Sequence, residues 1–291
     1  MPRDLRIAAT VTGWIGTVLL LDAVRAWDGV ELPRQLLLGL ATWTVLILLL
    51  RAEPPLVRSQ TLVVVALATM VEYTFSPLLQ AYVYRIGTVP LFVPPGHGLV
   101  YLAALALGRS AALRSAPRAA VLATVLVGGG WGGYGLFLAD RRDALGAFWF
   151  GCLLGFLVWG RNRLLYVGAF VVVSYLELVG TGLGTWAWAR HDPVLGVVTQ
   201  GNPPSGATGG YGWFDLYALL LAPAVIRAAG AVRSRARDLV PGRLRGRRPD
   251  RRPDRPGSRR PSRLEGAQDR LVQLAVGGDG AAAERAVDPV E

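Results

Sequence analysis

The feature that most constrains this chain is a series of long apolar segments spread over its first 230 residues. A helix needs about 20 consecutive apolar residues to cross the hydrocarbon core of a bilayer. Of the 291 residues, 52% are hydrophobic and only 18% are charged, which is too little charge for the wetted surface of a soluble protein of this length. The sequence therefore predicts an all-α, polytopic membrane helix bundle.

The positions of these segments predict about eight transmembrane helices in residues 1–230. Prolines and charged residues separate the segments from one another. Tryptophan and tyrosine cluster near the proposed ends of the helices, where their amphipathic rings suit the headgroup region. The expected spans cover residues 7–24, 36–50, 61–82, 97–107, 119–138, 144–159, 164–183 and 211–229.

The positive charge of the chain is concentrated within the C-terminal segment, residues 231–291, in the stretch from Arg233 to Arg263. Between Arg233 and Arg263 there are 13 arginines and three aspartates, which give +10 of the chain's net +11. Proline and charge prevent a packed core, so this tail is expected to be disordered. We expect it to bind anionic lipid headgroups, whereas the lack of interleaved aromatic residues disfavours nucleic acid as a partner.

The arginines of the short loops predict the orientation of the bundle. With the N-terminus inside, the inner loops hold nine arginines and the outer loops hold six. An even number of spans also returns the arginine-rich tail to the inner side, as the positive-inside rule requires. We therefore expect a multi-pass protein of the plasma membrane with both termini in the cytoplasm. All basic residues are arginines, a composition that suggests a GC-rich bacterial genome.

The third and seventh expected spans share a pattern that indicates an internal duplication. Glu72 and Glu177 each lie 13 residues before an arginine, Arg85 or Arg190. An aromatic-x-aromatic element, a Pro-Pro pair and a tyrosine follow in both copies. The pattern predicts a four-helix unit repeated once, as residues 1–115 and 116–230, with a site between the halves. Chance similarity is the alternative.

Glu72 and Glu177 are the strongest candidates for chemistry because each lies within an expected span. A carboxylate in hydrocarbon costs roughly 2.5–3.5 kcal/mol on insertion scales, so such residues normally face a bundle interior or a water-filled cavity. Two halves packed about a pseudo-twofold axis would place both glutamates at one central pocket. A neutral carboxyl group beside an ionised one is a general acid/base pair. The alternative is that each glutamate only bonds a neighbouring helix or Arg85 and Arg190.

Other polar residues complete the candidate site. His97 follows a Pro-Pro-Gly sequence and is expected to help in proton transfer, with an ordinary polar contact as the alternative. The Gly/Pro-rich loop 200–206 is either a re-entrant cover or an ordinary loop. The two histidines and two glutamates match no zinc spacing, so no metal or other cofactor is expected. The candidates for substrate binding are Tyr82, Arg85, Arg190, Asn202 and Asp215.

A further pattern consists of Glu72, the aromatic residues Tyr82 and Tyr84, and the run Val89-Pro90-Leu91-Phe92-Val93-Pro94. This pattern resembles the carotenoid-biosynthesis membrane hydratases, the bisanhydrobacterioruberin-hydratase-like family. Residues 177–188 resemble the family more loosely. The resemblance implies acid-assisted addition of water to an isoprenoid double bond, and it places Glu72 in a proton-donating role.

Three functions remain open from the sequence. The first, which we favour slightly, is an intramembrane enzyme that acts on a lipid or isoprenoid, with Glu72 and Glu177 as acid and base. The second is a proton-coupled transporter of a small molecule, with the same glutamates as coupling sites. The third is a non-catalytic membrane scaffold whose basic tail recruits partners or lipid.

Overall fold

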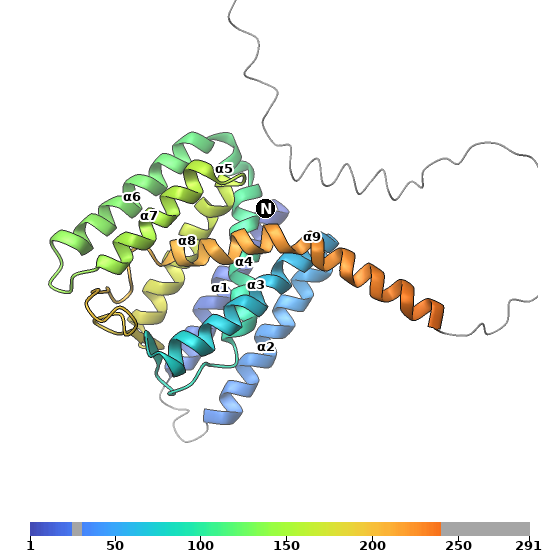
Figure 1. Ribbon diagram of the computed structural model, residues 1–291, viewed down its shortest axis with the longest axis horizontal. Coiled ribbons are helices and arrows are strands. Elements are labelled where there is room, and N and C mark those ends of the chain that lie inside the picture. The colour runs from blue at the N-terminus through green and yellow to red at the C-terminus, as the bar shows by residue number, and fades with distance from the viewer. Residues whose placement is uncertain (25–30, 240–291) are drawn as a thin grey trace, which may run out of the picture. The chain divides into compact units, whose positions relative to one another are not determined.

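The computed structural model describes residues 1–24 and 31–239 (Figure 1). Within this part of the chain the all-α membrane bundle is confirmed, with eight helices of 16 residues or more at the expected places. The expected tail lies outside the described residues from position 240 onward. The long helices are α1 (Arg3–Ala23), α2 (Glu31–Arg51), α3 (Pro55–Tyr73), α4 (Val93–Arg109), α6 (Pro117–Phe137), α7 (Ala144–Trp159), α8 (Arg163–Gly182) and α9 (Ala207–Leu239).

Six of these helices are long and apolar enough to cross a membrane: α1, α2, α3, α6, α8 and α9. The other two expected spans are shorter, because α4 has 17 residues and α7 has 16. At 1.5 Å per residue they extend about 24–26 Å, less than the roughly 30 Å of the hydrocarbon core. The short helix α5 (Ala111–Ser115) joins α4 to α6.

Local sequence signals explain most of the helix boundaries. Pro55 and Pro117 stand at the first position of α3 and α6, where the absence of an N–H costs nothing. Asp143 and Asn162 cap α7 and α8 by accepting hydrogen bonds from Gly146 N and Leu165 N. The third span was expected to continue to residue 82. It ends earlier, in the π-helical turn η2 (Thr74–Leu78), where Pro77 cannot donate a backbone hydrogen bond.

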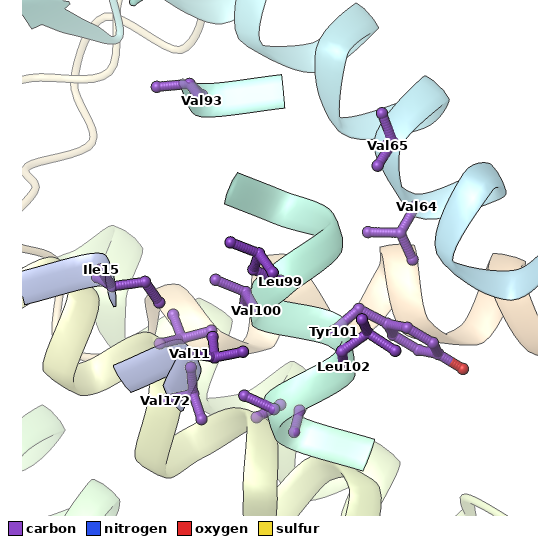
Figure 2. Packing of buried hydrophobic residues seen from close by; sticks show 14 of the residues in the cluster. Val11, Ile15, Val64, Val65, Val93, Leu99, Val100, Tyr101, Leu102 and Val172 are labelled. Atoms are coloured by element: carbon purple, nitrogen blue, oxygen red, sulfur yellow. The ribbon is translucent and has the colours of Figure 1, made fainter. Parts of the chain in front are cut away.

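Helix α4 forms the centre of the bundle. It packs most extensively against α8, and also against α1, α3 and α2. Figure 2 shows Leu99, Val100, Tyr101 and Leu102 projecting from α4 toward valines of the surrounding helices. A Cβ atom on Gly168 of α8 would collide with the carbonyl oxygen of Ala104, so glycine is needed for this close approach. Because other helices surround α4, its short length leaves no polar backbone facing lipid.

The connections after α3, α6 and α8 meet at one end of the bundle, which we call the loop end. There Arg141, between α6 and α7, donates to the carbonyl oxygens of Trp188 and Gln200 at 2.7 Å. At the opposite end, Glu53 is buried and accepts hydrogen bonds from Arg3 of α1 and Arg109 of α4. The arginine hydrogen bonds at the loop end and the ion pairs at the opposite end fix the helices against each other.

Candidate functional site

The two aromatic-x-aromatic elements of the sequence form a small antiparallel sheet at the loop end. They are the strands β1 (Tyr82–Tyr84) and β2 (Trp186–Trp188). In a strand, alternate side chains point to the same side, so the outer aromatic residues of each strand face one direction. The central residues, Val83 and Ala187, are exposed. The register pairs Tyr82 with Trp188, Val83 with Ala187, and Tyr84 with Trp186.

Glu72, in the last turn of α3, is held by three hydrogen-bond partners. The hydroxyl groups of Tyr82 and Tyr84 donate to its Oε2 atom at 2.9 and 2.8 Å. The Nε2 atom of His97, in the first turns of α4, lies 2.8 Å from Oε1. Glu72 and His97 are only 6% and 5% exposed. A buried carboxyl group with this many partners is fixed in position and shielded from bulk water.

Glu177, on α8, has a closely similar arrangement with different donors. The indole Nε1 atoms of Trp186 and Trp188 both donate to its Oε2 atom at 3.1 Å. The residue is 3% exposed. Among the described residues, no donor lies within hydrogen-bond distance of its Oε1 atom. Glu177 therefore retains one oxygen that is free to interact with a bound molecule.

Both glutamates line a single cavity of about 960 Å³. His97 also lines it and stacks on Tyr211 of α9, with ring centroids 5.3 Å apart. Most of the remaining wall is aliphatic or aromatic, with contributions from α1, α3, α4, α7, α8 and α9. The shared pocket expected from the sequence is present. Of the alternative roles considered from the sequence, pairing with Arg85 and Arg190 is not observed, because the side-chain partners of the glutamates are the aromatic donors and His97.

The segment with Glu72 and β1 closely resembles the segment with Glu177 and β2 in its contacts. The helices of residues 1–115 and 116–230 pack less alike. Helix α6 packs extensively against α7, while α1 makes few contacts with α2. The duplication of residues 1–115 as 116–230 stays a prediction. The sheet formed by β1 and β2 nevertheless relates Glu72 and Glu177 by a local two-fold pattern, with its centre at Val83 and Ala187.

Of the five expected substrate-binding residues, only Tyr82 lines the cavity. Arg85 forms an ion pair with the buried Asp22 at 3.1 Å, and Arg190 is exposed. Asn202 accepts a hydrogen bond from the backbone N–H of Trp188. Asp215 is buried outside the cavity wall, and its Oδ2 atom has no partner among the described residues. Arg85, Arg190 and Asn202 therefore support the loop end rather than the cavity.

Two residues that the sequence analysis did not single out hold the second strand in place. The buried carboxylate of Asp143 accepts hydrogen bonds from the backbone N–H groups of Gly201 and Ser205, at 2.7 and 2.6 Å. Arg141 donates to Trp188 O and Ala189 O at 2.7 Å. The loop 200–206 is thus a buried, anchored segment. An aspartate directly before an apolar helix is an N-cap signal that could have identified Asp143.

The two tyrosines remain hydrogen-bond donors over a wide pH range. Burial raises the pKa of Tyr82 and Tyr84 above its usual value, and the nearby charge of Glu72 raises it further. Both hydroxyl groups therefore stay protonated under ordinary conditions and continue to donate to Glu72. Within the described residues, no three His, Cys, Asp or Glu side chains gather as metal ligands.

In comparisons with known proteins, no family model matches the chain, and no curated protein or solved structure is significantly similar to it. The case for function therefore depends on the geometry of the cavity. Two carboxyl groups and an imidazole at the wall of an apolar cavity can move protons to and from a hydrophobic molecule. The aromatic rings beside them can stabilise a positive charge that develops on it.

Proposed function

We propose that this chain is an intramembrane enzyme that carries out acid–base chemistry on a lipid or isoprenoid. The observation that supports it most strongly is the pair of buried glutamates, each held by two aromatic donors at the wall of one apolar cavity. Intramembrane carboxyl groups are costly and are usually functional. A purely structural role would leave no reason for a cavity between them.

The surroundings of the two carboxyl groups suggest different roles. Glu72 uses both oxygens for His97 and the two tyrosines. Glu177 keeps its Oε1 atom without a protein donor in the described part of the chain. We assign Glu177 to direct proton exchange with the substrate. In this assignment the Glu72–His97 pair accepts the proton that the attacking water releases and passes it back to Glu177. The resemblance to carotenoid hydratases instead gives Glu72 the donor role.

Addition of water to a double bond, which that resemblance implies, is consistent with this arrangement. One carboxyl group gives its proton to an alkene carbon, and a positive charge forms on the neighbouring carbon. Water attacks this carbon and releases a proton to the ionised carboxylate. Transfer of that proton back to the first carboxyl group restores the enzyme, so one alkene and one water give one alcohol. The faces of Tyr82, Trp186 and Tyr211 line the cavity in which the cation forms.

The size and lining of the cavity favour a large apolar substrate. Ligand sites in proteins typically measure about 300–1,000 Å³, and this cavity lies near the upper limit. Its polar lining residues are few: Glu72, Glu177 and His97 with their tyrosine and tryptophan donors, and Thr42, Asp192 and Gln200 elsewhere on the wall. A long hydrocarbon chain with one reactive position fits such a wall better than a polar metabolite.

The test compares lipid extracts of cells that express the wild-type chain with those expressing Glu72→Gln or Glu177→Gln. Each substitution preserves shape but removes a titratable group, so the proposed product should disappear. Glu31→Gln is the control, because Glu31 lies at the loop end outside the cavity and is largely exposed. Identical lipid profiles in all four strains, with equal protein levels, would refute an enzymatic role.

A proton-coupled transporter is the second candidate, and one observation favours it. Equivalent glutamates from two corresponding segments meet at one cavity, as in carriers with a site between repeats. Reconstituted vesicles with an imposed pH gradient distinguish the two functions. Solute movement that depends on the gradient and is lost in Glu177→Gln indicates a carrier, whereas chemical conversion of a lipid without solute movement indicates the enzyme.

A further inference from the structure

The mouth of the cavity can be located from side chains that line it and are also exposed. Cavity-lining residues are mostly buried, but five of them have more than a third of their surface exposed. All five are apolar or aromatic, and they come from η2, the segment 191–199, α7 and α9. They are Phe75 (37%), Phe148 (60%), Val194 (60%), Leu195 (58%) and Trp213 (41%).

An opening to water normally carries polar or charged side chains at its rim, because these remain hydrated. A cluster of exposed apolar side chains instead indicates contact with a hydrophobic phase or a partner. Trp213 belongs to α9, which is long and apolar enough to cross a membrane, and Phe148 belongs to the apolar helix α7. The apolar rim is thus continuous with helix surfaces that face lipid.

The segment 191–199 is built as a rigid hairpin with an apolar tip. His191 and Thr199 form an antiparallel bridge at its base. The Oδ1 atom of Asp192 accepts hydrogen bonds from Val194 N and Leu195 N at 3.0 and 2.8 Å, and Gly196 adopts a positive φ of 69°. The base is tied to α7, because Leu145 N donates to Thr199 O at 2.9 Å.

The tip of this hairpin carries no charged side chain. Val194, Leu195 and Val197 are 60%, 58% and 86% exposed, whereas the one charged residue of the turn, Asp192, is 8% exposed. Its hydrogen bonds to the tip are internal, so the side chains exposed at the tip are apolar. The segment lies at the loop end, where Figure 1 shows the connection after β2 beside the turn between α6 and α7.

We propose that the segment 191–199 is a flap inserted in the lipid leaflet at the loop end, and that the cavity opens sideways into this leaflet between the flap, α7 and α9. A hydrophobic molecule then reaches Glu177 and Glu72 from within the bilayer, without passing through water. The location of the flap is independent of the proposed enzymatic activity. The nature of the molecule that enters rests on that activity.

Site-specific labelling in lipid nanodiscs tests the location of the flap and the mouth. The lone cysteine is first removed as Cys152→Ala, and single cysteines are introduced as Leu195→Cys, Val197→Cys, Phe148→Cys or His191→Cys. Each is labelled with an environment-sensitive NBD fluorophore. His191 is the control because it is exposed at the polar base of the same hairpin.

Lipids with a doxyl spin label on the acyl chain should quench the fluorophores at positions 195, 197 and 148 strongly, while aqueous iodide should quench only the one at position 191. Iodide quenching at 195 or 197 would overturn the inserted flap. Iodide quenching at 148 would overturn the lateral mouth. Fluorophores at the tip that are shielded from both quenchers would indicate a protein partner and would also overturn the proposal. None of these results depends on catalytic activity, so they are separable from the Glu→Gln test.

Discussion

The two glutamate-binding arrangements differ mainly in the chemistry of their donors. Glu72 is held by two phenol groups and an imidazole, whereas Glu177 is held by two indole groups. A phenol hydroxyl and an imidazole can each donate and accept, so they can pass a proton along a hydrogen-bonded chain. An indole N–H is only a donor and therefore fixes a carboxylate without relaying protons. The donors at Glu72 can therefore relay a proton, whereas the donors at Glu177 only hold the carboxyl group in position.

The largest effect is expected from His97→Gln. Loss of the imidazole removes the proton partner of Glu72, and turnover should fall by about 10²-fold or more, as for other acid–base groups. Product formation in membranes measures this. Because Glu72 and His97 act as a unit, Glu72→Gln combined with His97→Gln should be little worse than either alone. If the fold-losses of turnover in the two single variants multiply in the double variant, Glu72 and His97 do not act as one relay.

The next effect concerns Arg141, which supports the indole side only. Arg141→Gln removes charge-assisted hydrogen bonds to Trp188 O and Ala189 O. Unfolding by SDS in mixed micelles should show a loss of about 1.5–3 kcal/mol in the free energy of unfolding. The neighbouring Arg142 is exposed and makes one long contact, at 3.3 Å, with Leu136 O, so Arg142→Gln should change stability by less than about 0.5 kcal/mol. Equal losses in the two variants would exclude a special role for Arg141.

A smaller and more specific effect separates the tyrosines from the tryptophans. Tyr82→Phe removes one hydrogen bond to Glu72 and should cost about 1 kcal/mol of stability. It should also shift the pH dependence of turnover, because a member of the relay is lost. Trp188→Phe should lower stability and shift the pH profile less, because the indole positions Glu177 without relaying a proton. Equal shifts of the pH profile in the two variants would contradict the distinction between a relaying tyrosine and a positioning tryptophan.

The smallest expected signal comes from tyrosine ionisation. Because burial and Glu72 raise the pKa of Tyr82 and Tyr84, both should stay neutral at a pH where exposed tyrosines ionise. In the unfolded chain they ionise near pH 10, so the free energy of unfolding should fall as the pH rises above about 10. Absorbance at 295 nm should increase less in the folded wild type than in the unfolded chain. Replacing both tyrosines with phenylalanine should reduce that difference, while the buried Tyr101 and Tyr166 maintain part of it. Full titration of the folded wild type near pH 10 would contradict the burial of Tyr82 and Tyr84.

The helices could be predicted from the sequence because long apolar runs dictate them in a bilayer. The pairing of Glu72 and Glu177 at one cavity also followed from the repeated spacing. The sheet formed by β1 and β2 could not be predicted, because two three-residue strands far apart in the sequence pair only when the helices bring them together. The short length of α4 could not be predicted either. A helix surrounded by other helices does not have to cross the full hydrocarbon core.

Arg85 was expected at the substrate site but lies outside the cavity, which shows why spacing in the sequence alone does not locate a site. Arg85 follows Tyr84 directly, and consecutive residues of an extended chain point to opposite sides. Once the tyrosine hydroxyl faces Glu72, the arginine side chain must turn away, and it meets Asp22. The spacing in the sequence predicted that Arg85 lies in the same region as Glu72, but not the direction in which its side chain points.

The backbone hydrogen bonds between the two strands have a mechanical consequence. Tyr82 and Trp188 face each other across the sheet, and each donates to a different glutamate. Because the strands share backbone hydrogen bonds, a shift of one strand also moves the other, whereas either ring can still turn about its own side-chain bonds. The donors of the two acidic groups are thereby mounted on one piece of backbone.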